Sequence, residues 1–135
     1  MKTLSLITAS YNSARTIGDT LRSVDAQTWP NIEYLVVDGG SKDETMAIVA
    51  RDGRRVTSAV SEPDKGIYDA YNKGLNRATG DVIGFINSDD YYCSPDVIET
   101  VMKAFDDPAI EAAHADLVYV APENTGKIER HWKSR

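Results

Sequence analysis

The sequence is poor in cysteine and lacks a long hydrophobic segment. Cys93 is the only cysteine, so the chain can form neither an intrachain disulfide nor a thiolate metal cluster. A lone cysteine suits a reducing compartment, and we expect a cytoplasmic protein. No apolar run approaches the roughly 18 residues of a membrane-spanning helix, and the start of the chain resembles a first strand more than a signal peptide. Work at the inner face of a membrane would therefore depend on parts outside this sequence.

The chain also has fewer basic than acidic residues. The chain carries 15 Lys and Arg against 21 Asp and Glu, a formal charge of -6, which disfavours a general nucleic-acid binder. A small phosphorylated ligand remains compatible with this charge, because a divalent cation can bridge acidic side chains to phosphate. The proportions of hydrophobic and charged residues, 41% and 27%, are those of an ordinary globular protein. We expect one domain over residues 1–135, and nothing specifies its oligomeric state.

Short β-rich segments alternate with amphipathic helical segments. We expect strands at 3–8, 33–38, 56–60, 82–86, 117–120 and, after a turn at 124–126, at 128–132. Apolar spacing predicts helices over 14–26, 41–50 and 67–78, and a further one that begins at Ser94-Pro95. Ser41 and Glu44 have the form of a capping box for the second helix. This order predicts an α/β fold with a mainly parallel, Rossmann-like sheet and helices on both faces.

Polar segments follow the first four strands of this sheet. They comprise residues 8–12, 38–41, 62–66 and 87–91. Ligands of open α/β sheets bind beyond the carboxyl ends of the strands, so these segments should converge on one edge. Together they contain three groups of carboxylates, several small hydroxyl residues and an aromatic side chain. This edge is therefore the predicted ligand site.

Asp89 and Asp90 are the strongest single signal at that edge. Adjacent carboxylates after an apolar strand repel each other unless a cation compensates them. Magnesium-type sites use one or two carboxylates and leave room for substrate phosphates, and a diphosphate leaving group needs such charge neutralisation. The alternative is a pair of loop residues whose carboxylates accept hydrogen bonds from backbone N–H groups near the next helix.

Other residues of the same edge have weaker signals. Asp38, at the end of the second strand, can accept hydrogen bonds from a ribose or a base, or can simply form the turn before two glycines. Tyr11 can stack on a base, and Lys65 can meet a phosphate or remain solvated. His114 and His131 have no spacing typical of a metal site, and Asp116 is a carboxylate on a later strand without an assigned role.

Two long segments carry a family resemblance. They are SLITASYNSARTIGDTLRSVDAQTWPNIEYLVVDGGSKDET and SEPDKGIYDAYNKGLNRATGDVIGFINSDDYY. They resemble the N-terminal half of glycosyltransferase family 2, whose members have the GT-A fold. Ser88-Asp89-Asp90 is similar to the DxD motif of that family. The stretch SEPDKGIYDAYNKG is similar to a subgroup involved in the synthesis of bacterial cell-surface polysaccharide.

The resemblance implies a site for a nucleotide-sugar, with a UDP-sugar favoured. It implies that Asp38 holds the uracil, that Asp89 contacts the ribose or sugar, and that Asp90, with Asp89, binds Mn²⁺ or Mg²⁺. The implied donor-contacting residues are Thr8, Ala9, Ser10, Tyr11, Asp38, Asp64, Lys65 and Asp89.

The implied reaction is a metal-dependent, inverting transfer of the sugar to a hydroxyl acceptor such as a saccharide. Its catalytic base is expected beyond Arg135, in an acceptor-binding part, because no residue of this chain matches it. We expect little or no transfer by this chain alone, and the alternative is a fragment that binds a nucleotide-sugar without transferase activity. A dehydrogenase-like Rossmann protein is disfavoured, since no G-x-G-x-x-G follows the first strand.

Overall fold

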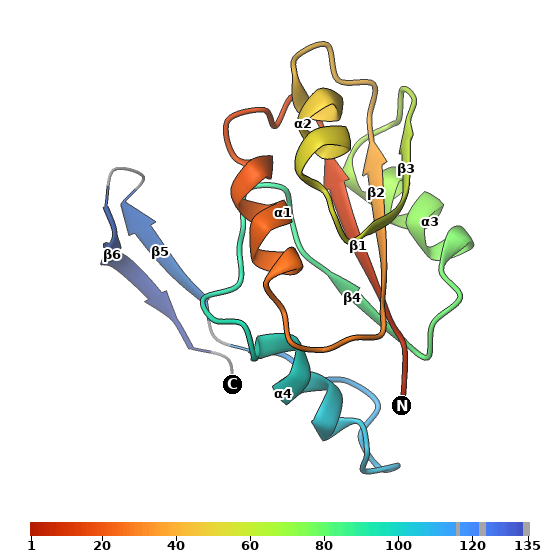
Figure 1. Cartoon of the computed structure of the whole chain (residues 1–135), viewed down its shortest axis with the longest axis vertical. Helices are drawn as coiled ribbons and strands as arrows, with labels where there is room; N and C mark the ends of the chain where they lie inside the picture. Colours follow the sequence, from red (N-terminus) through yellow and green to blue (C-terminus); the bar gives the residue numbers. More distant parts are fainter. Residues whose placement is uncertain (116, 122–123, 134–135) are drawn as a thin grey trace. The chain divides into compact units, whose positions relative to one another are not determined.

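A four-stranded parallel sheet forms the centre of the first of two compact units (Figure 1). The units are Met1–Met102 and Lys103–Arg135, and the computed structural model describes residues 1–115, 117–121 and 124–133. The strands occur in the order β3-β2-β1-β4. Their bounds are Leu4–Ser10 for β1, Ile32–Asp38 for β2, Val56–Ser61 for β3 and Val82–Phe85 for β4.

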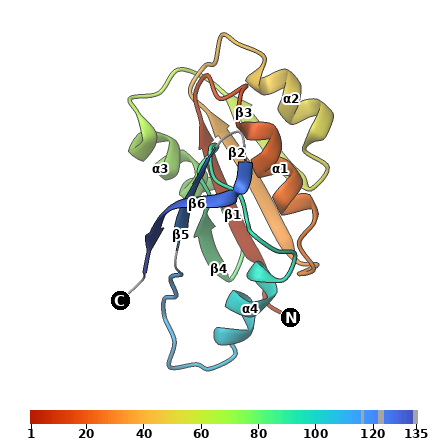
Figure 2. The same cartoon turned by 90° about the vertical axis from the view of Figure 1, so that its left-hand side faces the viewer.

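Helices cover both faces of this sheet (Figure 2). The helices α1 (Ile17–Asp25) and α2 (Thr45–Asp52) lie on one face, and α3 (Ile67–Arg77) lies on the other. The fourth helix, α4 (Val97–Ala104), contributes Ile98 and Met102 to the same core cluster as α1. The predicted α/β fold, with a mainly parallel sheet and helices on both faces, is confirmed.

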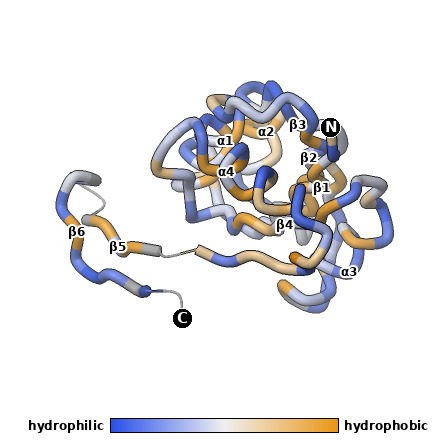
Figure 3. Tube along the Cα trace, turned by 90° about the horizontal axis from the view of Figure 1, so that it is seen from below, coloured by the Kyte–Doolittle hydropathy of each residue, from blue (hydrophilic) through white to orange (hydrophobic). Residues whose placement is uncertain are grey.

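The central strands β1 and β2 are buried because their side chains alternate between two apolar layers. Leu6 and Tyr34 face the larger cluster with α1, whereas Ala9 and Val37 face the smaller cluster with Ala70 of α3. Apolar colouring in Figure 3 accordingly follows β1 and β2, while the surrounding loops are largely hydrophilic. This packing holds the carboxyl ends of the strands at one edge of the sheet.

The strand register aligns three polar residues at that edge. Ser10 is the partner of Asp38, and Asp38 is the partner of Ser61, so the last residues of β1, β2 and β3 form one row. Parallel strands place these ends side by side, as expected from the sequence.

Two predicted helix starts are wrong. The Ser41 hydroxyl donates to Asp38 and leaves the start of α2 without a side-chain cap, so the expected capping box does not form. Ser94 likewise donates to Asp96, and α4 begins at Val97, later than the Ser94-Pro95 start. A capping serine accepts an N–H of the helix through its oxygen, whereas the Ser41 oxygen accepts from Asn12 N, and both serine hydroxyls are oriented by donating to a nearby carboxylate.

The second unit also differs from the expectation. Its strands β5 (Leu117–Ala121) and β6 (Asn124–Trp132) pair with each other antiparallel, and they form a separate two-stranded sheet. A connection this short can join only antiparallel neighbours, because a parallel pair needs a crossover. The turn expected at 124–126 is part of β6, and Asp116 lies outside the described residues. Throughout the described part of the chain, every helix is too short or too polar to cross a bilayer.

Candidate functional site

Asp38 fastens the loops at the carboxyl end of the sheet. Its side chain is fully buried and accepts five hydrogen bonds. Oδ1 accepts from the hydroxyls of Ser10 (2.7 Å) and Ser41 (2.6 Å), while Oδ2 accepts from Gly40 N (3.1 Å), Ser41 N (2.7 Å) and the Ser61 hydroxyl (2.7 Å). Burial opposes ionisation, but the hydrogen bonds from these serines outweigh it and lower the pKa of Asp38.

This environment changes the role expected for Asp38. A carboxylate that contacts a base needs an oxygen free for the ligand, whereas both Asp38 oxygens are engaged by protein donors. In the structure Asp38 thus holds the loops together, and both of its oxygens are occupied by protein donors.

A different carboxylate lies at the exposed side of the same strand end. Asp64, from the β3–α3 loop, packs over Gly39: a Cβ on Gly39 would lie 2.8 Å from Asp64 Oδ2. Asp64 is half-buried, and its Oδ1 accepts a hydrogen bond from Gly66 N at 3.0 Å. The absence of a side chain at Gly39 is what admits this carboxylate. Asp64 is thus an acidic group beside the end of β2 that solvent can reach.

The loop from β1 to α1 presents Tyr11 and Asn12 to solvent. The Thr8, Ala9 and Ser10 side chains are buried, so contacts from these three residues to a ligand would run through their backbone groups. Tyr11 is 60% exposed and can offer its ring to a planar group. Asn12, at φ 47, donates its N–H to the Ser41 hydroxyl and accepts from Lys42 N, which fastens this loop to the β2–α2 loop.

Asp89 and Asp90 follow β4 on a loop that is held by its other groups. The Ser88 hydroxyl bonds the Ser13 hydroxyl at 2.7 Å, and the Thr20 hydroxyl of α1 donates to the Asp90 carbonyl. Both aspartates are exposed residues, and within the described residues no backbone N–H donates to either carboxylate. The alternative of two loop aspartates neutralised by backbone groups therefore has no support here.

The electrostatics of this pair fit a bound cation. Partial burial of the Asp90 carboxyl, and then the charge of Asp89, raise the pKa of Asp90, while a hydrogen bond from the Asn87 side chain acts against the rise. Neither carboxylate has an ion-pair partner in the described part of the chain. In that part no three His, Cys, Asp or Glu side chains form a metal-binding group. Two carboxylates with an incomplete shell suit Mg²⁺ or Mn²⁺ completed by diphosphate oxygens.

Tyr71 and Asn87 lie beside the aspartate pair, although their sequence pattern did not mark them as site residues. The Tyr71 hydroxyl donates to Asn87 Oδ1 at 2.6 Å, and the Tyr71 ring lies 4.6 Å from that of Phe85 on β4. Burial, and then the charge of Asp90, raise the pKa of Tyr71, so its hydroxyl keeps the proton at neutral pH. The signal that could have revealed Tyr71 was a polar hydroxyl within an otherwise apolar helical stripe.

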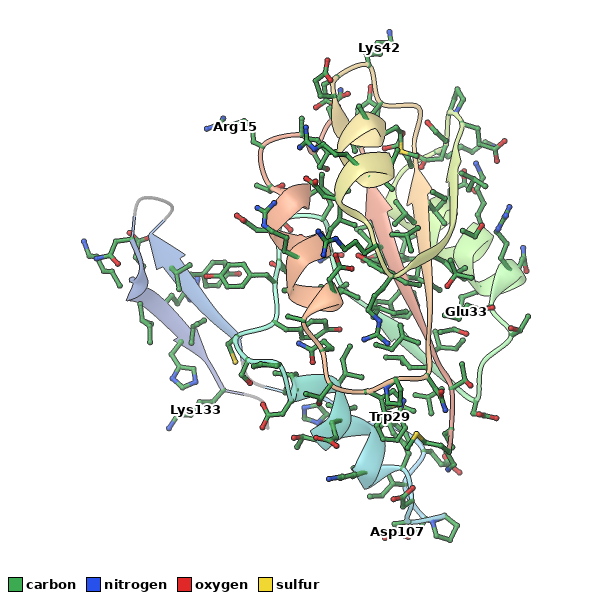
Figure 4. The ribbon with its side chains drawn as sticks, viewed as in Figure 1. Arg15, Trp29, Glu33, Lys42, Asp107 and Lys133 are labelled. Atoms are coloured by element: carbon green, nitrogen blue, oxygen red, sulfur yellow. The ribbon has the colours of Figure 1, made fainter. Side chains whose placement is uncertain are left out.

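Lys65 and Lys73 differ in whether a carboxylate pairs with them. Lys65 is exposed, and within the described residues its ammonium forms no ion pair. Lys73, in contrast, pairs with Glu62 at 3.1 Å and Asp69 at 3.7 Å. In Figure 4, Arg15 and Lys42 extend away from the loops at this end, whereas Glu33 and Trp29 lie toward the other end of the unit. Lys65 is thus available to an anionic ligand.

This chain is similar in sequence to known glycosyltransferases. Residues 5–135 match the family described as glycosyl transferase family 2. The chain is 39% identical over 103 residues to an uncharacterized glycosyltransferase of Mycobacterium tuberculosis (strain H37Rv), covering 76% of this chain and 39% of that protein. It is 37% identical over 93 residues to the Escherichia coli UDP-Glc:alpha-D-GlcNAc-diphosphoundecaprenol beta-1,3-glucosyltransferase WfaP, covering 68% of this chain and 37% of the relative.

A solved structure is similar as well. It is glucosyl-3-phosphoglycerate synthase from Mycobacterium tuberculosis in complex with Mn²⁺, UDP and glucosyl-3-phosphoglycerate, with a TM-score of 0.64 and 25% identity. The match covers 77% of this chain and 39% of that chain. The sequence thus spans well under half the length of these relatives. With its parallel sheet, converging loops and aspartate pair, the chain has the GT-A fold and belongs to glycosyl transferase family 2.

Proposed function

We propose that this chain is the donor-binding part of a metal-dependent glycosyltransferase that moves a sugar from a nucleotide-sugar, favoured to be a UDP-sugar, to a hydroxyl of a saccharide acceptor. The observation that carries the proposal is the uncompensated pair Asp89 and Asp90 at the carboxyl end of a parallel sheet. The UDP and Mn²⁺ bound to the similar synthase, and the UDP-glucose named for the E. coli relative, support the donor class.

The nucleoside would occupy the edge formed by the β1–α1 loop and the end of β2. Tyr11 offers an exposed ring on which a base can stack. Asp64, beside Gly39, offers a carboxylate that can accept from the N–H of uracil or from a ribose hydroxyl. Backbone groups of Thr8, Ala9 and Ser10 would add contacts, and Asp38 would hold the loops in place from beneath.

The diphosphate would lie toward Asp89 and Asp90. These two carboxylates would hold Mn²⁺ or Mg²⁺, and the ion would neutralise charge that develops on the diphosphate as its bond to the sugar breaks. Asp89 would also contact the ribose or the sugar, and Lys65, exposed on the β3–α3 loop, would approach a phosphate oxygen. This arrangement lets an acidic protein bind an anionic donor.

The acceptor and the catalytic base would belong to the remaining part of the enzyme. The relatives extend well beyond the matched region, so an inverting transfer, in which a base deprotonates the acceptor hydroxyl, would be completed there. The lipid-linked saccharide named for the E. coli relative supports a role in cell-surface polysaccharide synthesis. An acceptor of this kind would also favour a location in the cytoplasm at the inner face of the membrane.

Donor class can be tested by calorimetry with UDP, GDP, CDP and ADP in the presence of Mn²⁺. We expect UDP to bind most tightly, and a preference for another diphosphate would overturn the assignment of uracil. A transfer assay with radiolabelled UDP-sugars and simple saccharides shows whether this chain transfers the sugar on its own or only binds the donor. Binding without turnover supports a donor-binding part, whereas robust turnover by this chain would show that the base lies within it.

A further inference from the structure

We infer that Tyr71 is a positioning residue for the proposed cation site, because its hydroxyl fixes the orientation of the Asn87 side chain and thereby that of the Asp90 carboxylate. The inference rests on the proposed function, in which Asp90 is a ligand of the cation. Tyr71 lies on α3, and its hydrogen bond to Asn87 connects this helix to the loop that carries the aspartate pair.

The position of Tyr71 is defined by its packing. Its ring is tilted by 52° against that of Phe85 at 4.6 Å, and Tyr68 meets it edge-on at 6.4 Å. Val60 and Tyr71 pack against the buried cluster of Ala9, Val37 and Ala70. A ring held in this way presents its hydroxyl in one direction, toward the residue that opens the loop after β4. The 2.6 Å hydrogen bond to Asn87 Oδ1 is the result.

The amide of Asn87 has one accepting and one donating end. The hydroxyl of Tyr71 donates to the accepting end, so the amino group is left as the donor toward its other neighbour. That neighbour is the Asp90 carboxyl: Asp90 N donates to the Asn87 carbonyl at 3.1 Å, which closes the turn that joins the two residues, and the Asn87 side chain lowers the pKa of the Asp90 carboxyl, as a donor facing it does. In the flipped amide, Oδ1 would face the carboxylate and repel it. Tyr71 therefore selects the orientation of Asn87 in which the amino group is turned toward Asp90.

A carboxylate fixed in this way suits its proposed role. Hydrogen bonds from residues behind the ligands orient those ligands, and their removal costs about 10–100-fold in metal affinity or activity. Asn87 would orient Asp90 directly, whereas Tyr71 would act on Asp90 only through its hydrogen bond to Asn87. We therefore expect loss of the Tyr71 hydroxyl to have a smaller effect than loss of Asn87.

The test is calorimetric titration of UDP, with Mn²⁺ and with EDTA, on the wild type, Tyr71→Phe, Asn87→Ala and the double variant. Tyr71→Phe keeps the ring and its packing on Phe85, and Tyr68→Phe removes a hydroxyl from an exposed tyrosine as the matched control. We expect Tyr71→Phe to weaken binding in Mn²⁺ by about 5-fold and Asn87→Ala by about 10-fold or more, with binding in EDTA unchanged. Circular dichroism and thermal unfolding verify that each variant is folded.

The double variant shows whether Tyr71 acts through Asn87. If it does, Tyr71→Phe has no further effect once Asn87 is alanine, whereas independent roles give multiplied losses. Wild-type affinity in Tyr71→Phe, or an equal loss in Mn²⁺ and EDTA, would overturn the inference. A wild type whose UDP affinity is the same in Mn²⁺ and EDTA would instead refute the proposed cation site, so the two failures are distinguishable.

Discussion

Asp38 gives the sharpest prediction about how the site is held together. Asp38→Ala removes the acceptor of five hydrogen bonds and leaves the N–H groups of Gly40 and Ser41 without this partner. An unsatisfied donor costs about 1–3 kcal/mol, so these two part-buried groups predict a loss of about 2–6 kcal/mol in the free energy of unfolding. The hydroxyls of Ser10, Ser41 and Ser61 also lose an acceptor, so this range counts the two backbone donors alone.

Asp38→Asn is the matched control for this substitution. Its oxygen can take the place of Oδ2 and keep both backbone donors, while its amino group can donate to the hydroxyls of Ser10 and Ser41, which can accept. Only the contribution of the negative charge to these hydrogen bonds is lost, so we expect the free energy of unfolding to fall by about 1–2 kcal/mol at neutral pH. Urea denaturation followed by circular dichroism measures both variants.

The difference in stability between the wild type and Asp38→Asn should depend on pH in a defined direction. The folded state lowers the pKa of Asp38 below its ordinary value of 3.8, so the ionised carboxylate stabilises the folded state at pH values above that ordinary value. This stabilisation is lost as the pH falls through the lowered pKa, and Asp38→Asn lacks it throughout. The stability difference between wild type and Asp38→Asn should therefore shrink in acid.

Two results would refute this reasoning. A loss below about 1 kcal/mol for Asp38→Ala would show that the carboxylate does not hold the loops. A large loss of UDP affinity in a stable Asp38→Asn variant, with none in Asp64→Ala, would restore Asp38 as the group that contacts the base. We expect the reverse, with a decrease of about 10-fold for Asp64→Ala, as a hydrogen bond to a charged group implies.

Two further substitutions test the packing of α3 and the base-binding edge. Gly74→Ala should destabilise the chain by about 1–3 kcal/mol in urea denaturation, because its Cβ would lie 2.7 Å from Ile7 Cγ2, whereas Asn76→Ala on the exposed side of α3 should be neutral. An unaltered or raised stability of Gly74→Ala would contradict the close approach of α3 to β1. Tyr11→Ala should weaken UDP binding by about 10-fold in calorimetry through loss of about 1–3 kcal/mol of stacking, and Tyr11→Phe should retain it. Equal affinities of these two variants would remove Tyr11 from the base site.

The sheet and the position of its polar edge could be predicted from the sequence. The runs LSLITAS and IEYLVVD are apolar enough to require burial on both faces, and a parallel sheet then brings their polar ends together. The aspartate pair after β4 could be found for the same reason. These features depend on local patterns, which a sequence displays directly.

The orientation of individual side chains could not be predicted in the same way. Whether Asp38 faces a ligand or the protein depends on the register that places Ser10 and Ser61 beside it, and on the turn that brings Ser41 back to it. The contribution of Tyr71 depends on a hydrogen bond between residues 16 positions apart. Likewise, the antiparallel pairing of β5 with β6 depends on the connection between them more than on the pattern of either strand.

The central claim is that Asp89 and Asp90 bind the donor through a divalent cation. The most direct measurement is the affinity of UDP with and without Mn²⁺ for the wild type, Asp90→Ala and Asp106→Ala, the last being a control at an exposed carboxylate. We predict that Mn²⁺ strengthens UDP binding to the wild type and to Asp106→Ala by at least about 10-fold and has little effect on Asp90→Ala. Equal affinities of all three proteins under both conditions would contradict the account.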